Sequence, residues 1–244
     1  LCAPRAARNM AFQGIFPAWG QMPTQLLSFA GRELLGAAVS SPLCPYERIF
    51  MLPLTTISMT KGTAIVTSVP SDSPDDYAAF MDLQKPAKRE FYGVAAEWIE
   101  PFELVPVLST PDLGEMSAKF MCEKLKVTSQ KDVEKLKEAH DACYTSGFYK
   151  GVMTNGPFVG MKVEKAKVET RKYMVERGEA LTYLEPEGLV TPRSTPDVEC
   201  VVALVDQWYL KYGEAEWQAR VGEHLDTLEC YNPAVKKAFR DALD

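Results

Sequence analysis

The chain has 244 residues with 27 basic and 33 acidic side chains, which gives a net charge of −6. Apolar residues make up 46% and charged residues 25%, a composition typical of globular proteins that excludes collagen-like and low-complexity chains. No apolar run approaches ~18 residues, so the sequence predicts no membrane span. The acidic balance argues against a general nucleic-acid coat protein but leaves room for a local basic face.

Short apolar runs separated by proline and glycine fill the first part of the chain, up to about residue 112. Helical spacing predicts a helix over 25–35, which Gly36 would end. The runs at 49–53 and 64–69 predict buried strands, and each is closed by a proline because proline cannot donate to a central ladder.

The middle part of the chain, about 113–188, is charged and shows helical spacing. We expect one helix with Ser129 as its N-cap that ends near Gly147. A second helix is expected over about 159–177, followed by Gly178.

The last part of the chain begins near Val198. The apolar run at 200–205 predicts a strand, and the stretch 214–230 predicts a helix. Pro233 is expected to open a further helix at its first turn. The proline-rich stretch at 186–196 is the best candidate for a boundary.

A strand, a turn closed by proline and a helix start follow one another in the most informative segment. Ser71 or Ser73 can cap the helix, and Pro74 suits its first position. Asp75 and Asp76 fall in the first turn, where acidic side chains stabilise a helix by ~0.3–1 kcal/mol. From the pattern alone, helix stabilisation is therefore a complete explanation for both carboxylates.

This segment, residues 61–76, contains the pattern Gly62-Thr63-x-x-Val66-x-x-Val69-Pro70, followed by Asp72 and by Asp75-Asp76. The pattern resembles the editing-domain signature of the class I synthetases for branched aliphatic amino acids. Its longer form resembles leucyl-tRNA synthetases of the eukaryotic cytosol, and further resemblances lie at 6–10, 101–103, 147–153 and 199–210. Ala64 departs from the pattern, since the family usually has glycine there. The residues that carry the longer resemblance are Thr67-Ser68-Val69-Pro70-Ser71-Asp72-Ser73-Pro74-Asp75-Asp76.

The resemblance implies a mixed α/β (α+β) fold with a β-barrel core and peripheral helices. It assigns residues 1–197 to a CP1 editing domain. Residues 198–244 would then be a return segment towards a Rossmann-type aminoacylation domain.

The resemblance also implies hydrolysis of the ester of mischarged tRNA(Leu), such as a norvalyl or isoleucyl ester. Editing is needed because one methyl group discriminates by only ~1–3 kcal/mol at a synthetic site. Neither a metal nor a cofactor is implied for this step, whereas the parent enzyme uses ATP and Mg to ligate leucine to tRNA(Leu). The implied partners are the 3′ terminal adenosine of tRNA(Leu), the noncognate aminoacyl ester and the rest of the synthetase, with no membrane.

Individual site residues follow from the resemblance. Asp76 matches the family's carboxylate that pairs with the α-ammonium group of the substrate, and Asp72 is a weaker candidate beside it. The remaining candidates fall into two groups. Thr67, Ser68 and Val69 would line the amino-acid pocket, with core packing as the alternative for Thr67 and Val69, and Ser58, Lys61, Gly62 and Thr63 would hold the terminal adenosine.

A threonine-rich peptide that the family uses as a pocket wall is expected just upstream of Leu1, and the ATP-binding signatures are missing. The chain is therefore interpreted as a piece of a longer protein. The rival hypothesis is a non-catalytic fragment that binds the end of a tRNA or a nucleotide, and a weaker one is a sister enzyme for isoleucine or valine. Six scattered cysteines without a CxxC motif and two isolated histidines predict no metal site and a reducing cytoplasmic location.

Overall fold

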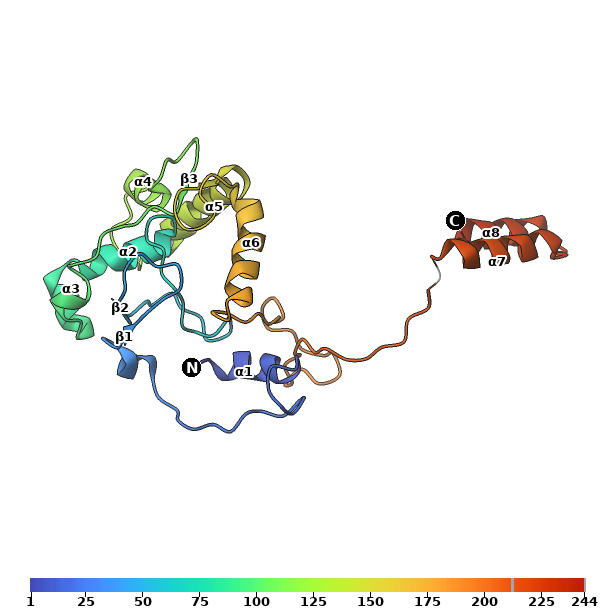
Figure 1. The fold of residues 1–244 in the computed structure, drawn as a ribbon, viewed down its shortest axis with the longest axis horizontal. Coiled ribbons are helices and arrows are strands. Elements are labelled where there is room, and N and C mark those ends of the chain that lie inside the picture. The colour runs from blue at the N-terminus through green and yellow to red at the C-terminus, as the bar shows by residue number, and fades with distance from the viewer. Residues whose placement is uncertain (212, 244) are drawn as a thin grey trace. The chain divides into compact units, whose positions relative to one another are not determined.

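The computed structural model describes residues 1–211 and 213–243. Its contacts divide the chain into two compact units, Leu1–Ala203 and Leu204–Asp244. Figure 1 shows helices joined by long irregular segments, with only short strands. In chain order the elements of the described part are α1 (Pro4–Ala11), η1 (Gly31–Leu34), β1 (Ala38–Val39), β2 (Ile49–Phe50), α2 (Pro74–Leu83), α3 (Pro86–Tyr92), η2 (Ala96–Trp98), β3 (Leu108–Ser109), α4 (Ser117–Lys124), α5 (Val133–Lys150), β4 (Val152–Met153), α6 (Val163–Glu176), α7 (Ala215–Thr227) and α8 (Pro233–Leu243).

Three helices, α2, α4 and α5, pack against one another and form the main apolar core of the first unit (Figure 1). Leu136 of α5 is only 2% exposed, and burying a leucine side chain contributes about 1.5–3 kcal/mol. This packing fixes the position of α2, whose first turn carries the acidic residues. The cluster consists of Tyr77, Ala78, Ala118, Cys122 and Leu136.

Two small antiparallel sheets complete the first unit. Strand β1 pairs with β2, with Ala38 opposite Phe50, and β3 pairs with β4, with Leu108 opposite Met153. The predicted mixture of helices and strands is therefore confirmed, but the strand expected at 49–53 is reduced to β2. Since each strand is 2 residues long and the sheets are separate, the described residues form no closed β-barrel.

Two predicted strands, 64–69 and 200–205, are irregular in the structure. Ala64 has a φ of 65°, which breaks the extended run at its start. The backbone N–H of Val202 donates to Oδ1 of Asn9 at 3.0 Å instead of to a neighbouring strand. An apolar run predicts burial, but it does not supply the partner strand that a ladder needs.

The predicted start of α2 is confirmed. Ser73 is the N-cap, its side-chain oxygen accepts from the backbone N–H of Asp76 at 3.5 Å, and Pro74 occupies the first helical position. Asp75 and Asp76 lie in the first turn, near the positive pole of the helix.

The N-cap predicted for α5 is wrong. Asp132 is the N-cap, and its Oδ2 atom accepts from the backbone N–H of Thr128 at 2.7 Å. Ser129 instead donates its hydroxyl to Oδ2 of Asp82 at 2.8 Å. The partner of Ser129 therefore lies on another helix, α2, which a local pattern cannot reveal.

Other helix ends differ from the predictions in instructive ways. α5 continues through Gly147 to Lys150, and α6 begins four residues later than expected but is followed by Gly178 with a φ of 69°. The helix expected at 25–35 is reduced to η1, because residues 21–30 are exposed and no apolar face is buried there.

The second unit consists of the predicted helices α7 and α8, which pack against each other. The division of the chain at 197 and 198 into an editing domain and a return segment stays a prediction. Among the described residues, no helix is both long and apolar enough to cross a bilayer.

Candidate functional site

Asp76 lies at the start of α2 with its side chain turned back onto the segment before the helix. It is 9% exposed, and its Oδ2 atom accepts from the backbone N–H of Val69 at 2.8 Å. The helix cap and this backbone contact together fix the carboxylate at the amino end of the helix. A carboxylate held in this position can bind a cationic group.

The electrostatics of Asp76 are set chiefly by burial, which raises the pKa of its carboxyl above 3.8. The Val69 N–H and the hydroxyls of Ser73 and Ser68 oppose this rise, and the neighbouring charge of Asp75 adds to it. A desolvated carboxylate of this kind gains free energy when a cation enters beside it.

The residues expected to form the pocket wall are more open than Asp76. Thr67 and Ser68 are exposed and Val69 is half-buried. Ser68 and Val69 both act on the Asp76 carboxyl, through a hydroxyl and a backbone N–H respectively. The structure therefore brings Ser68, Val69 and Asp76 together, and the exposure of Thr67 argues against core packing for that residue.

Asp72 has a different environment from Asp76. Its Oδ2 accepts from the hydroxyl of Ser71 at 2.6 Å, and its Oδ1 accepts from the hydroxyl of Ser117 at 3.2 Å. Burial raises the pKa of this carboxyl, while both hydroxyls oppose the rise. Asp72 therefore fastens the turn before α2 to the start of α4.

Two residues beside the acidic turn were missed by the sequence analysis. His140 of α5 lies with Nδ1 3.5 Å from Oδ2 of Asp75, and its ring stacks on Tyr144 with centroids 3.9 Å apart. Burial raises the pKa of Tyr144, and the charges of Asp76 and Asp75 raise it further. The spacing of four residues, which places both rings on one helix face, is the signal that could have identified them.

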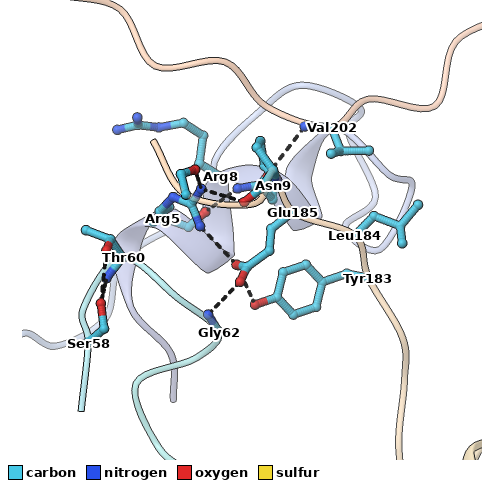
Figure 2. Close-up of polar contacts among 12 residues, drawn as sticks. Arg5, Arg8, Asn9, Ser58, Thr60, Gly62, Tyr183, Leu184, Glu185 and Val202 are labelled. Atoms are coloured by element: carbon cyan, nitrogen blue, oxygen red, sulfur yellow. Dashed lines mark hydrogen bonds and ion pairs between the residues drawn. The ribbon is translucent and has the colours of Figure 1, made fainter. Parts of the chain in front are cut away.

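The segment expected to hold the terminal adenosine forms a turn against α1. The Gly62 N–H donates to Oε1 of Glu185 at 2.8 Å, and the Thr63 carbonyl accepts from the Ala3 N–H at 2.9 Å. Ser58 and Thr60 share a hydroxyl contact of 2.9 Å (Figure 2).

Lys61, in the same turn, is exposed. The candidate residues thus form two groups, one around Asp76 and one around Gly62. Within the described residues, no hydrogen bond or ion pair joins the two groups directly. Glu185, which contacts the second group, and Arg5, which pairs with Glu185, could not be predicted because they are distant from Gly62 in sequence.

No group of three or more His, Cys, Asp or Glu side chains that could hold a metal ion occurs in the described part of the chain. All six cysteines are free thiols. Burial raises the pKa of Cys122 to about 12 and that of Cys143 to about 11. Because the thiolate is the nucleophile, neither residue is suited to covalent catalysis.

Comparison with known sequences gives close relatives, although no protein-family model matches. The chain is 45% identical over 244 residues to the putative cytoplasmic leucine–tRNA ligase of Schizosaccharomyces pombe. It is 46% identical over 244 residues to the cytoplasmic leucine–tRNA ligase of Pongo abelii. The alignments cover 100% of this chain but only 21% and 20% of those proteins, so the chain spans about a fifth of their length.

Solved structures give the same result. The crystal structure named GlLeuRS-CP1 matches with a TM-score of 0.65 and 42% identity, over 76% of this chain and 70% of that one. The editing domain of P. falciparum cytosolic leucyl-tRNA synthetase matches with a TM-score of 0.69 and 30% identity, over 75% of this chain and 61% of that one. These relatives are all aminoacyl-tRNA synthetases. Within that class, the chain belongs to the leucyl-tRNA synthetase family and matches its CP1 editing domain.

Proposed function

We propose that this chain carries most of an editing site that hydrolyses the ester of mischarged tRNA(Leu). The observation that carries the proposal is the buried Asp76 carboxylate, held at the amino end of α2 in a chain of the leucyl-tRNA synthetase family. An aminoacyl ester carries a free α-ammonium group, which Asp76 would pair with. This contact would orient the ester carbonyl, and orientation can lower a barrier by several kcal/mol.

The reaction is the attack of water on the ester carbonyl, with the terminal ribose hydroxyl as the leaving group. No covalent enzyme intermediate is required, and neither a metal nor a cofactor enters this step. Noncognate norvalyl and isoleucyl esters are the proposed substrates, because a leucine-binding site cannot reject them strongly.

The other candidate residues have supporting roles in this proposal. Thr67, Ser68 and Val69 form the wall beside the amino-acid side chain, and Asp72 supports the turn that carries Asp76. The terminal adenosine lies against the turn around Gly62. Its proposed binding residues are Ser58, Lys61, Gly62 and Thr63.

In the whole protein, we propose that the parent enzyme ligates leucine to tRNA(Leu) with ATP and Mg. The named relatives are cytoplasmic enzymes, which supports the same location here. Residues 198–244 would lead back towards the aminoacylation domain. In the whole protein, the irregular segments of residues 1–197 would take part in the β-barrel core of the editing domain.

The test uses the full-length protein that contains this chain and norvalyl-tRNA(Leu) as substrate. Asp76→Ala should lower the deacylation rate by about 100-fold or more, as expected when a reacting group loses its orientation. Asp141→Ala, at an exposed aspartate of α5, is the matched control and should keep the parent rate. Deacylation by Asp76→Ala at the parent rate would contradict the assigned role. Binding of an aminoacyl-adenosine analogue without any turnover by the parent would favour a binding module instead.

A further inference from the structure

Glu185 contacts the proposed adenosine turn although it lies more than a hundred residues further along the chain. Its Oε1 atom accepts from the Gly62 N–H at 2.8 Å, and its Oε2 atom lies 3.2 Å from Nη1 of Arg5. The Tyr183 hydroxyl donates to the same Oε2 at 3.3 Å. Figure 2 shows this carboxylate between the guanidinium group and the turn.

Arg5 contacts Glu185 and the backbone that follows Glu185. It belongs to α1 and is only 7% exposed, and its guanidinium group also pairs with Glu199. Its Nη2 atom donates to the carbonyl oxygens of Pro186 and Gly188 at 3.1 and 2.8 Å. Because the planar guanidinium group makes several directed contacts at once, it holds the Glu185 side chain and the backbone at Pro186 and Gly188 in one orientation.

A second set of contacts holds Leu184 against Gln13, just after α1, and Val202 against Asn9 of α1. Leu184 donates its N–H to Oε1 of Gln13 at 2.7 Å, and its carbonyl accepts from Nε2 of Gln13 at 2.6 Å. The Asn9 side chain likewise accepts from the Val202 N–H at 3.0 Å. Glu185 is therefore anchored through its side chain and through the residue before it.

The turn that Glu185 contacts needs external support. Gly62 has a φ of 63° and Ala64 a φ of 65°, and this left-handed region disfavours a residue with a Cβ such as Ala64. The Thr63 carbonyl between them accepts from the Ala3 N–H. Glu185 therefore constrains the turn at the Gly62 N–H, and Ala3, the N-cap of α1, constrains it at the Thr63 carbonyl.

We propose that Glu185 and Arg5 are positioning residues for the turn that holds the terminal adenosine. The inference rests on the proposed function, and it adds two residues that no local motif reveals. The Glu185 carboxylate fixes the Gly62 peptide, and the Arg5 guanidinium group fixes the carboxylate. Neither residue contacts the ester, so their loss should weaken substrate binding more than it slows the chemical step.

The experiment measures KM and kcat for deacylation of norvalyl-tRNA(Leu) by the full-length protein that contains this chain. Glu185→Ala should raise KM by about tenfold, the effect of one charge-assisted hydrogen bond, and change kcat by less than about threefold. Glu185→Gln keeps an oxygen for the Gly62 N–H and should raise KM by a smaller factor. Glu187→Ala, at an exposed glutamate of the same segment, should leave KM unchanged.

The outcomes separate the positioning role of Glu185 from the proposed editing function. An unchanged KM in Glu185→Ala, with an active parent, overturns the inference and leaves the proposed function intact. A parent that deacylates nothing overturns the proposed function itself. If Glu185→Ala loses its thermal transition, Glu185→Gln decides: a raised KM at a parent-like Tm supports the inference, and an unchanged KM overturns it.

Discussion

The Oδ2 atom of Asp76 accepts a hydrogen bond of 2.8 Å from the backbone N–H of Val69, seven residues earlier in the chain. This contact folds the segment before α2 back onto the first turn of the helix. The Asp76 carboxylate therefore stabilises the turn before α2, and it is also a buried anion. Burial of an anion destabilises the fold unless a cation binds, which is the pattern expected of a binding site.

Asp76→Asn should make the protein more stable and less active at pH 7. Burial raises the pKa of Asp76 above 3.8, so its contribution to stability is fully present below 3.8 and is lost as pH rises through the raised pKa. Removing the charge should raise Tm at pH 7 by about 2–4 °C, the shift for 1 kcal/mol in a chain of this size. Thermal unfolding at pH 7 and below pH 3.8 checks this, because the two proteins should converge in acid. A lower Tm for the variant at pH 7 would contradict it.

Asp82 should show the opposite dependence on pH. It is 1% exposed, and burial alone would raise its pKa, but Lys85, the Ser129 hydroxyl and the Gln130 N–H together lower it. Its contribution to stability is therefore present above 3.8 and lost as pH falls through the lowered pKa.

Asp82→Asn should consequently lower the free energy of unfolding at pH 7 by about 1–3 kcal/mol, because buried donors lose a charged acceptor. Urea unfolding at pH 7 and pH 3 measures the change, which should shrink at the lower pH. Asp141→Asn, at an exposed position of α5, is the matched control and should have little effect. If Asp82→Asn and Asp141→Asn lowered the free energy of unfolding equally, the hydrogen bonds of Asp82 would make no measurable contribution to stability.

Ala64→Gly should be neutral or stabilising. Ala64 has a φ of 65°, where a Cβ costs about 1–2 kcal/mol, and glycine removes that cost. The gain is offset in part by the larger entropy of glycine in the unfolded chain, about 0.5–1 kcal/mol. Ala30→Gly is the matched control, since Ala30 is exposed with a φ of −79°, and it should only destabilise. Urea unfolding compares the two, and equal destabilisation would rule out strain at Ala64.

A helix start can be predicted from the sequence where the capping residue and the first-turn proline are neighbours in the chain. The cap at Ser73 and the proline at 74 fixed the start of α2, because both act on the backbone of their own first turn. The N-cap of α5 was missed because Ser129 contacts Asp82 on another helix. The strands at 64–69 and 200–205 were wrong because a strand exists only where a second strand pairs with it.

Some residues of the candidate site could be predicted from one local motif, and others could not. Asp76, Ser68 and Val69 lie within one contiguous motif, so their proximity could be inferred from the chain alone. Tyr144 and Glu185 come from distant segments, and only the folded chain brings them to the site. Whether the site residues act as proposed stays a prediction for the variants described above.

The sequence by itself determined the family, the start of α2 and the carboxylates in its first turn, because these depend on residues within one short motif. Tertiary structure alone decided that Asp76 is buried and that Asp72 accepts a hydrogen bond from Ser117 of α4. It also decided that Glu185 contacts the Gly62 turn and that Arg5 pairs with Glu185. Burial and long-range hydrogen bonds depend on how α1, α2, α4 and α5 are packed, and no local spacing encodes that packing.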